Sequence, residues 1–272
     1  YSVTSNTKVV VNALEQDVTI YWIVQSGKED DIIENLLSKY ETLSGHIKVV
    51  KKNPDVFPSF TEQYTNETVQ NNSLIVECGD RSRFIGYDDI YIQEADVYSY
   101  SYNTSFDGEG AITSAIDYVV SEELPQLYML EGHGEAELPA TFSEQIEKEN
   151  IEVSSFSLLT VDSVPEEADC VLIYAPTSDI SEEEKTELLD YLEAGGKAMI
   201  FSDYTQDDLP NFDAVLENYG VKCAEGIVFE GDNQHYGMQM PYYLVPTVNS
   251  TDASSETASA GSYVLAPYAQ GI

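Results

Sequence analysis

The sequence has 272 residues, of which 12 are Lys or Arg and 49 are Asp or Glu, so the formal net charge is −37. Hydrophobic residues make up 42% and aromatic residues 11%, a globular composition in a chain long enough for one large domain or two ordinary ones. Phosphate backbones and anionic lipids repel a chain this acidic. The charge balance therefore disfavours nucleic-acid binding and membrane adhesion through a basic surface.

No stretch reaches the roughly 18 consecutive apolar residues that a membrane-spanning helix needs. The chain begins at Tyr1 without a Met or a secretory signal segment, and a structured pattern at 263–266 lies just before Ile272. We therefore expect this chain to be a piece of a longer protein.

The first half alternates strand-like and helix-like segments. The run at 18–24 is rich in β-branched and aromatic residues, which is typical of a buried strand. Apolar residues at helical spacing follow the acidic run 29–31, and Gly45 closes that helix. The predicted elements are a strand at 18–24, a helix to 45, a strand at 47–50, a short helix at 58–64, a hairpin at 73–78 and 81–85, an aperiodic Tyr-rich stretch at 87–106 and a helix at 111–120.

This order, strand–helix–strand–helix–hairpin–helix, is that of a thioredoxin-like layer over residues 1–122. A redox member would carry its thiols at the first strand–helix junction, where this chain has Gln25-Ser26-Gly27-Lys28. The three cysteines, Cys78, Cys170 and Cys223, are scattered without a CxxC pair, and we interpret them as buried thiols that serve as small apolar residues. The prediction is a thioredoxin-like scaffold without redox function.

The second half follows a different pattern, with repeated strand–helix units over residues 123–235. Short apolar runs predict strands at 126–130, 151–156, 170–174, 197–201 and 226–229, and helices are predicted at 140–150, from the capping box at 181–184 to Gly195, and at 212–219. Such units predict a doubly wound parallel sheet of the flavodoxin or Rossmann type. Residues 236–272 are predicted to be irregular, with the small polar run 251–262 as a mobile loop or surface arm.

Polar residues follow three of these predicted parallel strands, at the edge where open α/β sheets bind ligands. Glu131, His133 and Glu135 follow the first strand, Asp179 follows the strand at 170–174, and Asp203 follows the strand at 197–201. In Glu131-Gly132-His133-Gly134-Glu135, a His and carboxylates could transfer protons, coordinate a metal or bind a polar ligand. The alternative is a tight strand–helix turn whose His only bonds the backbone.

Known catalytic and phosphate-binding patterns do not fit the chain. There is no HExxH, no GxxxxGK[ST], no GxGxxG after a strand and no nucleophile elbow. The acidic pairs Asp88-Asp89 and Asp207-Asp208 lack the spacing of a calcium loop and are interpreted as solvated surface. We predict no cofactor, no metal and no catalytic residue.

An ordered set of short stretches resembles the Gldg-family auxiliary subunits of ABC transporters, a group that includes a gliding-motility component. The stretches are Val18-Thr19-Ile20-Tyr21, Gly79-Asp80-Arg81, Tyr87-Asp88-Asp89, Glu109-Gly110-Ala111-Ile112-Thr113-Ser114-Ala115-Ile116, Gly132-His133-Gly134-Glu135, Asp179-Ile180-Ser181-Glu182-Glu183-Glu184 and Tyr191-Leu192-Glu193-Ala194-Gly195-Gly196-Lys197. The resemblance covers most of residues 1–230.

The resemblance implies a protein anchored in a bacterial cell membrane, with this domain on the extracytoplasmic face and its anchoring helices outside the fragment. It implies the ABC permease and ATPase subunits as partners. It also implies a second half similar to glutamine-amidotransferase sheets, although the amidotransferase cysteine does not occur at the matching turn.

Two functions follow as hypotheses. The first is a non-enzymatic extracytoplasmic module that binds a ligand or a transporter partner. The second is a hydrolase or metal-dependent enzyme centred on His133, Glu135 and Asp203, which requires these three side chains to converge in one cleft.

Overall fold

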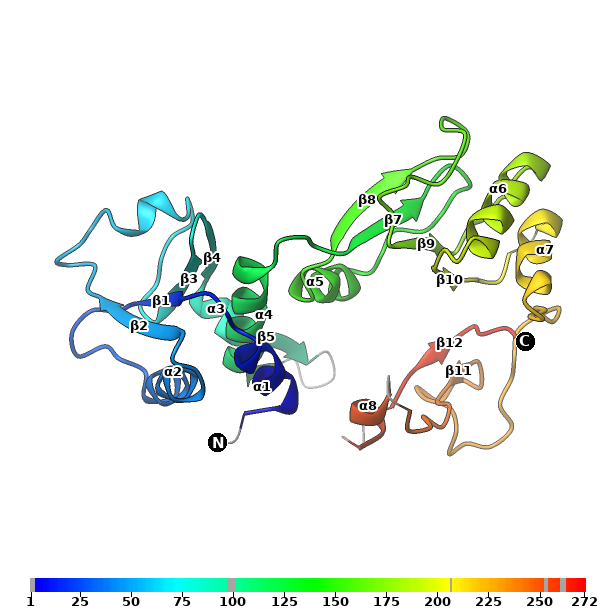
Figure 1. Ribbon diagram of the computed structural model, residues 1–272. Coiled ribbons are helices and arrows are strands. Elements are labelled where there is room, and N and C mark those ends of the chain that lie inside the picture. The colour runs from blue at the N-terminus through cyan, green and yellow to red at the C-terminus, as the bar shows by residue number, and fades with distance from the viewer. Residues whose placement is uncertain (1–2, 97–100, 206, 252–253, 260–262) are drawn as a thin grey trace. The chain divides into compact units, whose positions relative to one another are not determined.

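The computed structural model describes residues 3–96, 101–205, 207–251, 254–259 and 263–272 (Figure 1). The chain divides into two compact units. The first comprises 1–125 together with 141–152, and the second comprises 126–140 together with 153–272. The sequence-based boundary near residue 123 differs from this division in one segment, 141–152, which packs with the first unit.

The first unit is built on a four-stranded sheet with the order β2-β1-β3-β4. Its strands are β1 (Val18–Ile23), β2 (Ile47–Lys52), β3 (Ser73–Cys78) and β4 (Arg81–Ile85). β1 runs parallel to β2 and antiparallel to β3, and β3 and β4 form the hairpin that Gly79-Asp80 predicts. The predicted strands at 18–24, 47–50 and 73–85 are therefore confirmed.

Alternating apolar residues give this sheet a core face. Val18, Ile20 and Trp22 of β1 lie in the main hydrophobic core with the inner faces of α2 (Asp31–Leu43) and α4 (Gly108–Val120). Asp30 precedes α2 and caps it, because its side chain accepts the N–H groups of Ile32 and Ile33. Every second residue of the strand and every third or fourth residue of the helices therefore face the same hydrophobic core.

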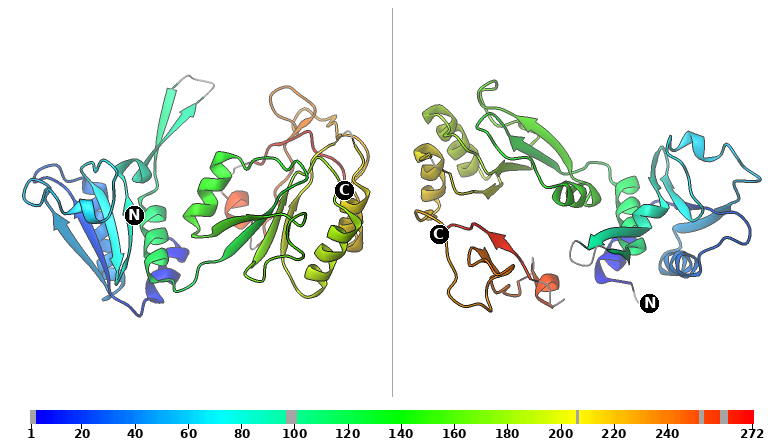
Figure 2. Two further views of the ribbon diagram at one scale, coloured as in Figure 1. Left: turned by 90° about the horizontal axis from the view of Figure 1, so that it is seen from above. Right: turned by 180° about the vertical axis from the view of Figure 1, so that it is seen from behind.

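Some elements of the first unit differ from the sequence-based prediction. The short helix expected at 58–64 is only a 3₁₀ turn, η1 (Thr61–Gln63), beside which the rings of Phe60 and Tyr64 pack on Tyr21. A helix not predicted from the sequence, α1 (Ser5–Asn12), packs on α4. The stretch 87–106, expected to be aperiodic, forms α3 (Tyr87–Ile90) and a two-stranded ribbon of β5 (Tyr91–Asp96) and β6 (Ser101–Phe106), visible in Figure 2.

The second unit contains a sheet with the order β10-β9-β7-β8. Its strands are β7 (Gln126–Leu130), β8 (Glu152–Phe156), β9 (Cys170–Tyr174) and β10 (Ala198–Phe201). β7, β9 and β10 pair in parallel, and the bonds Glu131 N–H to Phe156 O and Glu152 N–H to Pro125 O give β8 the same direction. The chain is thus a mixed α/β protein with a four-strand parallel sheet.

Helices α6 (Glu182–Glu193) and α7 (Pro210–Asn218) pack on each other and on the second hydrophobic core. The helix between β7 and β8, α5 (Ala140–Lys148), is bonded to the first unit through its C-terminal end. Lys148 Nζ binds Asp107 at 2.9 Å, and Asn150 donates to the Ser114 carbonyl at 2.9 Å. These bonds explain why 141–152 belongs with the first unit.

The strand predicted at 226–229 is wrong. This segment is irregular, and its Val228 N–H bonds the end of the chain instead, donating to Ala269 O at 2.8 Å. Beyond residue 230 the chain forms β11 (Tyr243–Leu244), β12 (Ala266–Pro267) and the short α8 (Ser255–Ser259). The expectation of a mobile loop or arm at 251–262 falls partly outside the described residues.

The three cysteines are all free. Cys78 is buried, as expected of a small apolar residue, whereas Cys170 and Cys223 are half-buried.

In the part of the chain that the structure describes, no helix combines the length and apolar character required to cross a membrane.

Candidate functional site

The turn after β7 requires glycine at two positions. Gly132 and Gly134 have φ angles of +120° and +71°, a region that side chains with a Cβ rarely adopt. A Cβ on Gly134 would also lie 2.2 Å from Thr177 Oγ1. Between the two glycines, the His133 carbonyl accepts the N–H groups of Thr177 and Ser178, each at 2.9 Å. The loop after β9 is thereby held against this turn.

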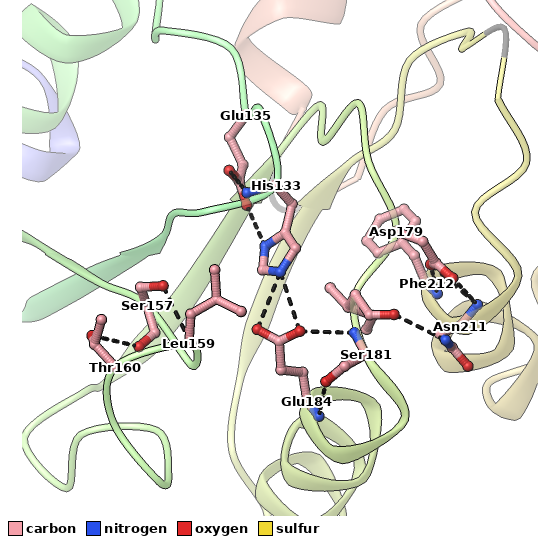
Figure 3. Close-up of polar contacts among 11 residues, drawn as sticks. His133, Glu135, Ser157, Leu159, Thr160, Asp179, Ser181, Glu184, Asn211 and Phe212 are labelled. Atoms are coloured by element: carbon pink, nitrogen blue, oxygen red, sulfur yellow. Dashed lines mark hydrogen bonds and ion pairs between the residues drawn. The ribbon is translucent and has the colours of Figure 1, made fainter.

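The His133 ring lies between two carboxylates (Figure 3). Its Nδ1 is 3.2 Å from Glu135 Oε1, and its Nε2 is 3.1 Å from Glu184 Oε1 and 3.2 Å from Oε2. The side chains of His133, Glu135 and Glu184 are only 4%, 7% and 5% exposed. Both ring nitrogens therefore face a buried carboxylate.

Glu184 lies in the first turn of α6, where it caps the helix and contacts His133. Its Oε2 accepts the Ser181 N–H at 2.7 Å, and its own N–H donates to Ser181 Oγ at 3.1 Å, which is the reciprocal bonding of a capping box. Its carboxylate also meets His133, 51 residues away in the chain. The sequence indicated the capping box but not this second contact, because nothing in the local pattern shows where a helix start will lie in space.

The buried His with its two carboxylates is suited to holding elements together. Glu135 binds the His133 ring and also accepts the His133 N–H at 2.8 Å, which closes the turn on itself. Glu184 then joins that turn to α6. Among the described residues, no group of three or more His, Cys, Asp or Glu side chains has the arrangement needed to hold a metal ion. The imidazole has no nitrogen directed to solvent, so a substrate would have to displace a carboxylate to reach it.

The other predicted site residues lie apart from this ring. Glu131 is exposed. Asp179 caps α7, because its carboxylate accepts the N–H groups of Asn211 at 3.0 Å and Phe212 at 2.9 Å (Figure 3). Asp203 is exposed, and its Oδ1 accepts the adjacent Tyr204 N–H at 2.7 Å.

Asp203 lines a separate pocket of about 570 Å³ at the carboxyl end of β10. Asp207, Asp208 and Asp213 line the same pocket. Burial raises the pKa of Asp213, and the negative charges of Glu217, Asp179 and Asp208 raise it further. His133 and Glu135 thus share one cluster, whereas Asp203 lines an acidic pocket with other side chains.

Comparison with known proteins finds two family models that match parts of the chain. Residues 124–257, which include the parallel sheet and the His133 turn, match the family model of an ABC-type uncharacterized transport system. This match supports an ABC transporter auxiliary component. Residues 1–92 match the model of a domain of unknown function, DUF7088. Searches of curated proteins and of solved structures give no significant match.

Proposed function

We propose that this chain is a non-enzymatic, extracytoplasmic domain of a membrane-anchored auxiliary protein of an ABC transporter. Its role is to bind a ligand or a transporter partner. The observation that carries the proposal is the match of residues 124–257 to the ABC-type transport system. The partners proposed are the permease and ATPase subunits of that system.

The geometry around His133 supports a role without catalysis. A general base must reach its substrate within hydrogen-bond distance, directly or through a water. The His133 ring is instead buried against Glu135 and Glu184, and Asp203 binds its neighbour in another pocket. This arrangement favours a structural His over the alternative of a hydrolase or metal-dependent enzyme at His133, Glu135 and Asp203.

The finer fold assignments are part of the same proposal. The order β2-β1-β3-β4, with β1 and β2 parallel and β3 and β4 a hairpin, supports a thioredoxin-like first unit whose strand–helix turn lacks thiols. The parallel sheet β10-β9-β7-β8 supports a second unit similar to flavodoxin or glutamine-amidotransferase sheets. Together with the stretches quoted above, these orders favour the gliding-motility-type subgroup.

Copurification from membranes tests the partnership. The full-length protein is affinity-tagged and expressed with the permease and ATPase subunits of its own transport system. After detergent extraction we expect both subunits to be recovered with the tagged protein. An identically tagged, unrelated acidic domain on the same anchor is the control for charge. Equal recovery by the control, or no recovery by the full-length protein, would refute the partnership.

Location and catalysis need separate measurements. Protease added to intact spheroplasts should cleave the domain, whereas a cytoplasmic marker should survive. Cleavage only after lysis would contradict an extracytoplasmic position.

Hydrolase activity that is lost in His133→Gln, with unchanged folding by circular dichroism, would contradict the non-enzymatic proposal.

A further inference from the structure

A polar pocket of about 550 Å³ lies within the first unit, among α1, α4 and α5. This volume is within the range of small-molecule sites. The stretch from Glu109 to Ile116, part of the resemblance described above, supplies much of the wall through Glu109, Gly110, Thr113 and Ser114.

One buried carboxylate in the lining of the pocket, that of Glu109, is held in place by a network of hydrogen bonds. Glu109 is 8% exposed, and its Oε1 accepts the Thr4 N–H at 2.6 Å and the Thr7 hydroxyl at 2.7 Å. Thr7 also bonds Thr113 at 2.8 Å, and Thr113 bonds the Tyr40 hydroxyl at 2.6 Å. A connected network of this kind holds its members in one geometry.

Gly110 allows the wall beside Glu109 to form. A Cβ at this position would lie 2.4 Å from Asp107 Oδ1, so only glycine lets the Asp107 carboxylate fold over the first turn of α4. Asp107 in turn binds Lys148 of α5 at 2.9 Å. The lack of a side chain at Gly110 therefore allows the Asp107 carboxylate to take its place in the lining of the pocket.

The charges of the wall argue against an ionic ligand. Each carboxylate among the described lining residues already accepts a hydrogen bond from within the unit. The donors are Lys148 for Asp107, Thr4 and Thr7 for Glu109, Asn150 for Asp117, and Gln145 for Glu149. Paired carboxylates have a reduced need for a cation, while four of them beside a single lysine repel anions.

The remaining groups suit a neutral ligand that both donates and accepts hydrogen bonds. Hydroxyls (Thr4, Thr113, Ser114) and amides (Asn6, Gln145) line the pocket, and Phe106 adds an apolar wall. We propose that this pocket binds a neutral, hydroxyl-rich small molecule, namely a mono- or disaccharide. Its hydroxyls would donate to the carboxylates and accept from the amides, and its C–H face would pack on the apolar wall.

Titration calorimetry on the 272-residue chain tests the site with D-glucose, N-acetyl-D-glucosamine and maltose as probes. The variant Asn6→Ala/Gln145→Ala removes two exposed lining amides, of which Gln145 bonds only the exposed Glu149 on its own helix turn. Asn35→Ala/Gln63→Ala is the matched control, because it removes two exposed amides that do not line the pocket. We expect saturable binding of at least one probe, weakened roughly tenfold or more by the first pair and unchanged by the control.

Spermidine and inorganic phosphate are titrated in parallel as a cation and an anion. The proposal is overturned if no sugar binds saturably, if the lining variant binds as well as the wild type, or if spermidine alone shows variant-sensitive binding. The inference deepens the proposed ligand-binding role, but its failure is distinguishable. Copurification with the permease and ATPase does not depend on the pocket, so either result can fail while the other stands.

Discussion

At the scale of the residue, the role of His133 follows from the two buried carboxylates beside its ring. A buried carboxylate loses its hydration, and it needs a donor or a positive partner to offset that loss. Glu135 and Glu184 lie on opposite sides of one imidazole ring, at 3.2 and 3.1 Å, and each also accepts one backbone N–H. The ring therefore stabilises the turn after β7 and the start of α6 together.

Removing the ring should be strongly destabilising. We expect His133→Ala to lower the free energy of unfolding by about 3–5 kcal/mol, because two buried carboxylates lose the ring that lies between them and keep only one backbone N–H each. Urea unfolding followed by far-UV circular dichroism measures the change. His46→Ala is the matched control, since its pair with Asp17 is exposed and worth at most about 1 kcal/mol. Similar losses in the two variants would contradict the structural role of His133.

The two-glycine turn gives a second prediction. Gly134→Ala and Gly220→Ala both place a Cβ at positive φ, +71° and +80°, which costs on the order of 1 kcal/mol. Only Gly134→Ala also meets an obstacle, the Thr177 hydroxyl. We expect it to be the more destabilising of the two in the same urea assay. Adding Thr177→Ala should recover part of the difference, and equal losses for both glycines would refute the steric account.

The thiols give a third prediction. Burial raises the pKa of Cys78, and the charge of Asp17 adds to the effect. We expect iodoacetamide to modify Cys78 more slowly than the half-buried Cys223 near neutral pH, with the rate rising as the pH increases. Peptide mass spectrometry follows both sites, and urea-unfolded protein is the control in which they should react alike. Insulin-reductase activity that depends on Cys78 would contradict a scaffold without redox function.

At the scale of the element, α1 is attached to α4 through Glu109. Burial by itself raises the pKa of this carboxyl, but hydrogen bonds from Thr7 and Thr4 outweigh it and hold the pKa below its ordinary value. The folded state therefore binds this proton less readily than the unfolded state. The resulting stabilisation is present above the unfolded pKa and is lost as the pH falls through the folded one.

Glu109→Gln should flatten this acid dependence. Between pH 7 and about pH 3, we expect the wild type to lose more stability than the variant, because only the wild type carries the depressed carboxyl pKa. Urea unfolding read by Trp22 fluorescence is suitable, since the single tryptophan lies in the core of the same unit. Glu62→Gln, an exposed change, is the control. Parallel curves for wild type and Glu109→Gln would contradict the assignment.

At the scale of the whole molecule, the net charge of −37 opposes the folded state through self-repulsion. Raising the salt concentration from about 0.01 to 0.15 M shortens the Debye length from about 30 to about 8 Å. We therefore expect Tm to rise over this range in differential scanning calorimetry. Repeating the series with sodium and potassium chloride controls for ion identity. A flat or falling Tm would show that local pairing already compensates the charge.

Local patterns explain which elements could be predicted. The hairpin at 73–85 depends on a Gly-Asp turn between two apolar runs, and both signals lie within a dozen residues. The ribbon of β5 and β6 lacks apolar alternation, so its pairing was not predicted. The segment 226–229 has an apolar run without a neighbouring strand to pair with, and it bonds the end of the chain instead.

The sequence by itself determined the α/β composition, most strands and helices, the acidic surface and the glycines of the His133 turn, because these depend on local periodicity and backbone conformation. Only the tertiary structure decided that His133 meets Glu184 while Asp203 lines another pocket, and that 141–152 packs with the first unit. Contacts between distant segments depend on how sheets and helices pack, and no local pattern encodes that geometry.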